Sequence, residues 1–347
     1  MRERGTFSNG YARRTARLNA KMSRSLTVAS PWVQRRVGGI AVALCAAVAL
    51  FAQQVKIEPR QKAPPKQEES RPANLRVDTT LILVPVSVND PLNRPVSGLE
   101  RENFRLLEDK VPQAITQFAM DDEPVAVGLV FDTSGSMGEK LQRSRAAASE
   151  FFRLANPEDE FFLIQFDDRP RLTVSLTSDT GSIENQLLFS KSKGSTALLD
   201  AIYMALHEMR RSKKNKKALL VISDGGDNNS RYTEREVTNL VRESDVLIYS
   251  IGVFGGGTTP EEFSGSSLLT KVSEQTGGRL FEANAVELPD IAKKIGIELR
   301  NRYILGYSPQ NQVRDGKYHK ITVQVIPPRG LPKLTAHWRL GYNAAIE

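Results

Sequence analysis

Two continuous apolar runs constrain the fold of this chain more than any other feature: "VAVGLVFD" at 125–132 and "KALLVISD" at 217–224. A strand is apolar at every position when both faces of its sheet are covered, as in a parallel sheet between helices. Further strands are predicted at 160–166, 171–176, 245–253 and 277–283, and helices at 139–155, 197–209 and 286–302. Strands that alternate with helices predict an α/β fold, with a doubly wound and mostly parallel sheet, over residues 122–302.

Segments of pure β pattern lie on both sides of this domain, at 75–121 and 303–343. Each holds too few strands to be stable alone. We therefore expect the two to pair into a small β-sandwich that the α/β domain interrupts. Within them, Pro85 predicts an edge strand or a bulge, because proline cannot donate a ladder hydrogen bond. The Arg-Asp-Gly sequence at 314–316 predicts a hairpin turn.

The positive charge of the chain is concentrated at its beginning. The net charge is +8, and residues 1–36, with nine basic residues and one acidic residue, account for it. Because the remainder of the chain is balanced, its charge indicates no nucleic-acid partner.

An uncharged, apolar segment follows at 37–52 and ends at Ala52. A basic region, an apolar core and a small residue at its end are typical of a secretory signal peptide. We expect 1–52 to be a signal peptide or a membrane anchor, and the protein to be extracytoplasmic (periplasmic, secreted or on the surface). The apolar segment is short for a spanning helix, so membrane contact is expected only through this segment if it is uncleaved. Met22 is an alternative start.

The residues after the leader predict a flexible connection. Residues 53–74 are charged and rich in proline, which is typical of a disordered linker. The single cysteine, Cys45, lies within the apolar leader segment. A chain cleaved after Ala52 therefore has neither disulfide bonds nor thiolate metal ligands.

Oxygen-bearing side chains follow the two apolar strands. Asp132 ends the first strand, with Ser134 and Ser136 in the loop after it, and Asp224 ends the second. Thr196 precedes a predicted helix, in a loop that the topology places at the same edge of the sheet. Ligands bind at the carboxyl ends of the strands in such a sheet. Oxygen donors without sulfur or imidazole suit Mg²⁺ or Mn²⁺, so these residues form a predicted metal site.

Each of these residues also has a purely structural interpretation. Aspartate, serine and threonine are preferred helix caps, so Ser195 and Thr196 could cap the helix that follows them. Asp224 could belong to an ordinary turn. Asp227, three residues further on, is expected to point to solvent or to cap the next helix.

Enzymatic interpretations compete with a binding site. A serine nucleophile needs a base, and the predicted elements place the histidines away from this edge: His207, His319 and His337. A phosphate-transferring aspartate of the haloacid dehalogenase type needs a second aspartate where Ser134 stands. A metal-dependent hydrolase would use the same ion as a Lewis acid, but the sequence offers no obvious base beside it. We therefore expect that the protein is not an enzyme.

The pattern D-x-S-x-S at 132–136, followed by Thr196 and Asp224, resembles the von Willebrand factor type A domain. The resemblance covers roughly residues 122–300. In that family these five positions form the metal-ion-dependent adhesion site, which implies the same role here. The flanking segments resemble the acidobacterial proteins related to this domain, which are exported chains without an established activity. Lys110 departs from that subfamily, where glycine is expected in an E-D-G turn.

The donor set and the resemblance together predict an exported, divalent-metal-dependent protein-binding module of adhesion type. Neutral hydroxyl ligands leave the ion under-neutralised, so an aspartate or glutamate side chain of a partner protein can complete its shell. The alternatives are a hydrolase that uses the same ion and a scaffold in which the metal only stabilises the fold.

Overall fold

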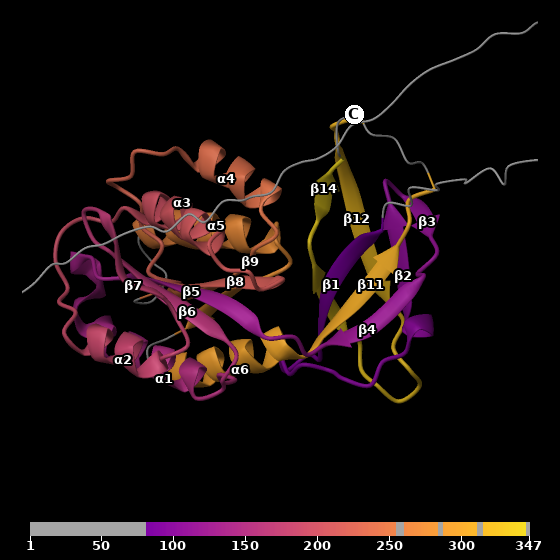
Figure 1. The fold of residues 1–347 in the computed structure, drawn as a ribbon, viewed down its shortest axis with the longest axis horizontal. Helices are drawn as coiled ribbons and strands as arrows, with labels where there is room; N and C mark the ends of the chain where they lie inside the picture. Colours follow the sequence, from indigo (N-terminus) through magenta and orange to yellow (C-terminus); the bar gives the residue numbers. More distant parts are fainter. Residues whose placement is uncertain (1–80, 255–259, 284–286, 311–314, 345–347) are drawn as a thin grey trace, which may run out of the picture. The chain divides into compact units, whose positions relative to one another are not determined.

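The two apolar runs form the central strands of a six-stranded sheet, β5 (Val125–Asp132) and β8 (Lys216–Ser223), in the computed structural model (Figure 1). The structure describes residues 81–254, 260–283, 287–310 and 315–344. The signal peptide or anchor and the linker predicted before residue 75 lie outside these residues. All described residues belong to one compact unit, 74–347.

The sheet has the strand order β10-β9-β8-β5-β6-β7 and is parallel except for β7, which runs antiparallel to β6. The outer strands are β6 (Glu160–Phe166), β7 (Pro170–Thr177), β9 (Leu247–Val253) and β10 (Leu280–Ala283). Every residue of β5 is buried, as expected for a strand covered on both faces. A Cβ atom at Gly128 would lie 2.2 Å from the Phe162 ring, so only glycine fits there. The predicted doubly wound α/β fold is confirmed.

Helices cover both faces of this sheet (Figure 1). The first face packs against α1 (Leu141–Phe152), α2 (Thr180–Leu188) and α6 (Leu288–Arg300). The second face packs against α3 (Leu198–Met209), α4 (Glu234–Glu243) and α5 (Pro260–Glu274). A short 3-10 helix, η2 (Gly135–Lys140), precedes α1 and replaces the start of the helix predicted from residue 139.

For three of these helices, α2, α4 and α5, no bounds were predicted from the sequence. In α4 the apolar stripe is narrow, with Val237 and Val241 as its buried apolar residues. Thr233 and Glu236 form a capping box that stabilises its first turn. In α5 serine and glycine interrupt the apolar periodicity that sequence analysis depends on.

The flanking segments form two four-stranded sheets that share a core, which confirms the predicted sandwich. One sheet has the order β13-β1-β11-β4, with β1 (Ile82–Asn89), β4 (Gln117–Asp121), β11 (Arg302–Tyr307) and β13 (Thr335–Trp338). The other has the order β14-β12-β2-β3, with β2 (Phe104–Glu108), β3 (Val111–Gln113), β12 (Tyr318–Val325) and β14 (Gly341–Asn343). A 3-10 turn, η1 (Arg101–Asn103), leads into β2. Both sheets therefore contain strands from each end of the chain.

Two local predictions about the sandwich were wrong. The predicted hairpin at 314–316 is wrong because β11 and β12, the described strands before and after it, belong to different sheets. β1 is an inner strand although it contains Pro85. Strand β13 pairs only with residues 86–89 of β1. Pro85 lies just outside this paired stretch, so its missing N–H costs no hydrogen bond to β13.

The α/β domain and the sandwich are joined by a buried polar cluster around Glu298 of α6. Its carboxylate accepts hydrogen bonds from Arg279 (2.6 Å), from the hydroxyl of Tyr249 (2.9 Å) and from Asn89 of β1 (3.3 Å). The side chain of Glu298 is only 1% exposed. Burial and the neighbouring Glu298 carboxylate raise the pKa of Tyr249, so its hydroxyl remains a donor.

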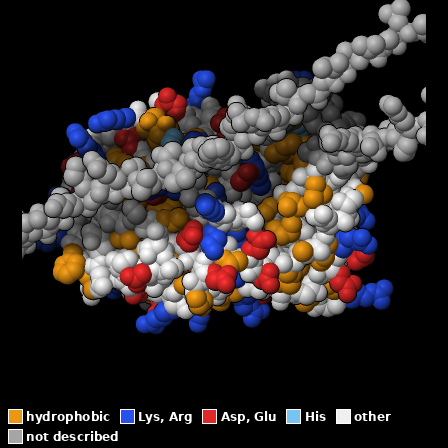
Figure 2. All heavy atoms as spheres, viewed as in Figure 1, with side chains coloured by type: hydrophobic (Ala, Val, Ile, Leu, Met, Phe, Trp, Pro, Cys, Tyr) orange, Lys and Arg blue, Asp and Glu red, His pale blue; other side chains and the backbone are white. Residues whose placement is uncertain are grey.

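The surface of the described part of the chain carries charges of both signs. Figure 2 shows acidic and basic side chains interspersed on the face in view, with apolar side chains between them. Within the described ranges, no helix is long and apolar enough to cross a membrane.

Candidate metal centre

Asp132 lies at the carboxyl end of β5 and is fully buried. Its Oδ1 accepts a hydrogen bond from the backbone N–H of Ser134 (2.8 Å), and its Oδ2 accepts one from the hydroxyl of Ser223 (2.5 Å). Burial raises the pKa of Asp132 to about 6, and the negative charge of Asp224 adds to this rise. Asp132 therefore holds its proton to a higher pH than an ordinary aspartate does.

The Asp132 carboxylate has no lysine or arginine partner among the residues that the structure describes. A buried carboxylate is costly unless it is paired with a positive charge or coordinates a metal ion. A cation bound beside Asp132 would supply the missing charge. The buried carboxylate thus fits a divalent ion.

The loop after β5 presents the two serines together. The hydroxyl oxygens of Ser134 and Ser136 lie 3.1 Å apart. Ser134 is buried, whereas Ser136 in η2 is exposed. This pair of hydroxyls therefore leads from the buried carboxylate to the surface, where a ligand has access.

Thr196 lies in a loop that packs against the D-x-S-x-S loop. Backbone N–H groups connect the two, from Gly135 to the carbonyl of Gly194 (3.0 Å) and from Lys193 to the carbonyl of Thr133 (2.9 Å). Thr196 is nearly buried and exchanges two hydrogen bonds with Asn228, which follows β8. Thr196 is therefore held between the loops that carry Asp132 and Asp224.

Asp224 directly follows β8 and is 7% exposed. Its Oδ2 lies 3.4 Å from the ammonium group of Lys140, a long distance for an ion pair. Gly225 turns the chain after it with a φ of +77°, and a Cβ there would lie 2.6 Å from the backbone of Gly265 in α5. Because neither Gly225 nor Gly265 has a side chain, α5 can pack directly against the turn that carries Asp224.

The structure brings the five predicted positions to one edge of the sheet, from three separate segments. The neighbouring side chains Ser223, Lys140 and Asn228 were not predicted to take part. Ser223 directly precedes Asp224 in the sequence, but its inward orientation is visible only in the tertiary structure. That the five predicted positions bind a metal ion stays a prediction.

Asp227 has a different role from the one expected. Its Oδ1 accepts from the backbone N–H of Leu199 (3.2 Å) and from the hydroxyl of Ser230 (2.6 Å). It therefore caps α3, which precedes it in the sequence, whereas the next helix, α4, is capped by Thr233. The N-cap residue of α3 is Ala197 and makes no side-chain cap hydrogen bond, so Asp227 supplies the interaction that Thr196 was suggested to make.

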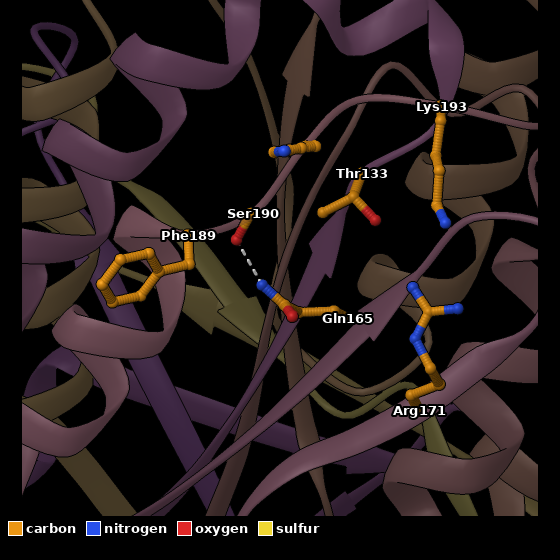
Figure 3. A pocket seen from close by; sticks show the side chains of 7 residues that line it. Thr133, Gln165, Arg171, Phe189, Ser190 and Lys193 are labelled. Atoms are coloured by element: carbon orange, nitrogen blue, oxygen red, sulfur yellow. Dashed lines mark hydrogen bonds between the residues drawn. The ribbon is translucent and has the colours of Figure 1, made fainter.

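A cavity of about 260 Å³ lies beside this edge, next to Thr133 (Figure 3). Figure 3 shows Lys193 and Arg171 extending toward each other on one side of the cavity and Phe189 on the other. Phe189 is 79% exposed, whereas Arg171 forms a bidentate ion pair with Asp167. The cavity thus offers positive charge and an apolar ring beside the predicted metal site.

The three histidines lie on other elements, as expected. His207 is in α3, where its Nδ1 contacts the carbonyl of Tyr203 within the same helix. His319 and His337 lie in β12 and β13 of the sandwich. No histidine hydrogen bond to the predicted metal ligands occurs within the described residues.

A doubly wound domain that gathers carboxylates and hydroxyls at the carboxyl edge of its sheet has the architecture of a ligand-binding α/β domain. Residues 127–226 match the family model of the von Willebrand factor type A domain. The chain thus carries a von Willebrand factor type A domain, as its sequence motif implied.

Relatives of this chain include two proteins of low identity. An uncharacterized protein of Borreliella burgdorferi is 26% identical over 200 residues, which cover 49% of this chain and 58% of the relative. Mouse inter alpha-trypsin inhibitor heavy chain 4 is 24% identical over 227 residues, which cover 59% of this chain and 24% of the relative. The chain therefore spans less than two thirds of each relative.

A solved structure with a similar fold is proximal thread matrix protein 1 from mussel byssus, which has zinc in its metal-ion-dependent adhesion site (MIDAS) motif. It is 19% identical, with a TM-score of 0.46, and the match covers 56% of this chain and 50% of the mussel chain. A likeness of this kind concerns the fold, and nothing about the present site follows from it.

Proposed function

We propose that this protein is a divalent-metal-dependent binding module of adhesion type, whose ion is Mg²⁺ or Mn²⁺. Asp132 and Asp224 supply the carboxylates, and Ser134, Ser136 and Thr196 supply the hydroxyls. The observation that carries the proposal is the fully buried Asp132 carboxylate, which lacks a cationic partner among the described residues. Its hard oxygen neighbours suit these ions better than softer metals.

The bound ion supplies an electrophilic centre that attracts a carboxylate of a partner protein. Ser136 is exposed, so a partner side chain has access to this edge. Lys191 and Lys193 are exposed beside it, and Leu188 and Phe189 are 64% and 79% exposed. We therefore expect the partner to present an aspartate or glutamate to the ion, with further acidic and apolar side chains against this neighbouring surface.

Capture of a partner tests this proposal directly. Purified protein on beads, incubated with envelope extract in Mg²⁺, is expected to retain proteins that EDTA releases. The Asp132→Ala variant is expected to retain none of them, whereas Asp227→Ala retains them all. A double variant, Lys191→Ala with Lys193→Ala, keeps its Mg²⁺ affinity but holds the partner more weakly. Equal capture in Mg²⁺ and in EDTA contradicts a metal-dependent module.

The same geometry supports binding more than hydrolysis. A Lewis-acid hydrolase needs a general base beside the ion. Among the described residues, the contacts of Asp132 and Asp224 come from serine, a backbone amide and Lys140, and no histidine is among them. We propose a protein without catalytic activity, which takes no nucleic acid as partner.

We further propose that the module works outside the cytoplasm. The motivation is the basic leader with the apolar segment at 37–52. Alkaline phosphatase fused after Ala73 is expected to be active, because this reporter folds only after export. An inactive fusion would contradict the proposal.

The raised pKa of Asp132 predicts a pH-dependent metal affinity. Below a pH of about 6 the carboxyl of the metal-free protein holds a proton that the ion must displace. We expect the Mg²⁺ affinity to fall about tenfold between pH 7 and pH 5, since each pH unit below the pKa costs up to tenfold. Isothermal titration at the two pH values measures this change, and equal affinities would contradict the assignment.

The same pKa has a consequence for the metal-free protein. The folded state holds the Asp132 proton up to a pH of about 6, whereas an ordinary aspartate releases it near 3.8. Between these values the folded state binds more protons than the unfolded chain, so the contribution of Asp132 to stability is lost as the pH rises. Thermal melts in EDTA, compared with melts of Asp132→Asn, isolate this contribution.

A further inference from the structure

A second cluster of metal-binding residue types lies in the sandwich, outside the site described above. Glu108 ends β2, Asp109 begins the turn to β3, and His319 lies in β12. Potential ligand atoms of these three residues lie within 4.8 Å of one another. The cluster therefore unites nitrogen and oxygen donors from two strands.

The pairing of β2 with β12 brings the three residues together. Ile321 lies opposite Glu108, and the backbone N–H of Asp109 donates to the carbonyl of Lys320 (2.9 Å). Asp109 Oδ1 accepts from the backbone N–H of Lys320 (2.9 Å), which leaves Oδ2 for His319. The positions of the donors are thus fixed by backbone hydrogen bonds on both strands.

The imidazole ring of His319 has a defined orientation. Its Nδ1 lies 2.8 Å from Asp109 Oδ2 and 3.4 Å from Glu108 Oε1. Its Nε2 lies 3.4 Å from Asp315 Oδ1 on the other side. In metal sites the nitrogen that does not bind the ion donates to a carboxylate, which keeps the other nitrogen free of a proton. Asp315 is placed to accept that bond, so Nδ1 can face the two carboxylates as a ligand.

The Glu108 carboxylate is buried beside the hydroxyl of Tyr307, whose pKa is raised by burial and by this carboxylate. Its side chain is 7% exposed, and its Oε2 makes no hydrogen bond of ordinary length within the described part of the chain. Its Oε1 accepts from the hydroxyl of Tyr342 (3.1 Å), which orients the carboxylate. A buried carboxylate oxygen without a partner is costly, and a cation would satisfy it.

We propose that Glu108, Asp109 and His319 bind a transition-metal ion of the Zn²⁺ type, independently of the von Willebrand factor type A site. One imidazole and two carboxylates form a ligand set that zinc accepts, and water completes the shell. Two carboxylates and a neutral imidazole carry a charge of −2, which the ion neutralises. The mixture of nitrogen and oxygen donors distinguishes this site from the all-oxygen site at Asp132.

A proton is the competing occupant. Protonated His319 would form ion pairs with the same carboxylates, with the distances given above. That arrangement would leave Glu108 Oε2 with only the neighbouring Tyr307 hydroxyl as a possible donor, whereas a metal ion would contact both carboxylates and the ring nitrogen at once. Measurement of zinc uptake separates the two occupants.

The experiment uses the Asp132→Ala background, so that the first site cannot contribute. Isothermal titration with Zn²⁺ at pH 7.5 is expected to show one bound ion in Asp132→Ala and none in Asp132→Ala with His319→Ala. Glu108→Gln keeps the acceptor for Tyr342 and is expected to lower the Zn²⁺ affinity at least tenfold. His207→Ala, which removes an exposed histidine of α3, is the matched control and should bind as Asp132→Ala alone does.

Two further readouts separate metal loss from misfolding. Zn²⁺ is expected to raise the melting temperature of Asp132→Ala but not that of the double variant, because ligands stabilise only the state that binds them. Melts in EDTA check that all variants fold. Equal Zn²⁺ uptake with and without His319 would overturn the proposal, as would the absence of uptake in Asp132→Ala. Neither result bears on Mg²⁺ binding at Asp132, which the unmodified protein reports separately.

Discussion

Alanine at Asp132 or at Asp224 is expected to abolish Mg²⁺ binding while the protein stays folded. Each substitution removes one of the two carboxylates at the predicted site, and the remaining hydroxyls cannot neutralise a divalent ion. Without metal, Asp132→Ala is expected to be as stable as the parent or more stable, because it removes a buried carboxylate that lies near Asp224.

Asp227→Ala is the matched control for this prediction. It removes a neighbouring carboxylate that caps α3, so it should cost about 1 kcal/mol of stability and leave the Mg²⁺ affinity nearly unchanged. Isothermal titration with Mg²⁺ and Mn²⁺ on the three variants, together with melts in EDTA, makes the comparison. Loss of binding in Asp227→Ala with retention in Asp224→Ala would show that the ion lies elsewhere. Unchanged binding in all three variants would make Asp132 and Asp224 structural residues.

Glu298→Ala is expected to destabilise the protein by about 3–5 kcal/mol, the usual effect of breaking a buried ion pair from one side. Arg279 would be left 10% exposed without its carboxylate, and Tyr249 and Asn89 would lose their acceptor. The hydrogen bonds that are lost lie where α6 of the α/β domain contacts β1 of the sandwich. We therefore expect the sandwich to unfold at lower denaturant concentration than the α/β domain in this variant.

Urea unfolding measures this effect, with the fluorescence of Trp338 in β13 reporting on the sandwich and circular dichroism reporting on the helices. Asp245→Ala is the control, because Asp245 forms an ion pair with Arg339 but is 85% exposed, and exposed pairs contribute little. Replacing both Glu298 and Arg279 with methionine should recover part of the lost stability. A change below about 1 kcal/mol in Glu298→Ala would contradict a stabilising role for the cluster.

Local sequence patterns predicted the central strands of the sheet and the sandwich. The runs at 125–132 and 217–224 are apolar at nearly every position, and this property alone places them in a covered sheet. The β pattern of both flanks likewise predicted a shared sandwich, since neither flank could bury a core alone. The boundaries at residues 122 and 302 stay predictions.

The packing of α5 and the role of Asp227 depend on contacts between segments that are far apart in the sequence. Helix α5 has a weak apolar periodicity, and its close approach to the sheet edge depends on Gly225 meeting Gly265. The capping role of Asp227 required knowledge that the loop after β8 returns to the start of α3. Along the sequence Asp227 is closer to α4, but in the folded protein its carboxylate lies at the start of α3.

The sequence by itself determined the α/β class, the alternation of strands and helices along the chain, and the chemistry of the residues at the carboxyl ends of two strands. Periodicity and residue type are local properties, so they can be read without knowing which segments meet. The tertiary structure alone decided the pairings across long sequence distances, such as Thr196 with Asn228 and Glu108 with His319. These pairings follow from strand register and from the packing of loops, which depend on the whole chain and leave no signal within either segment.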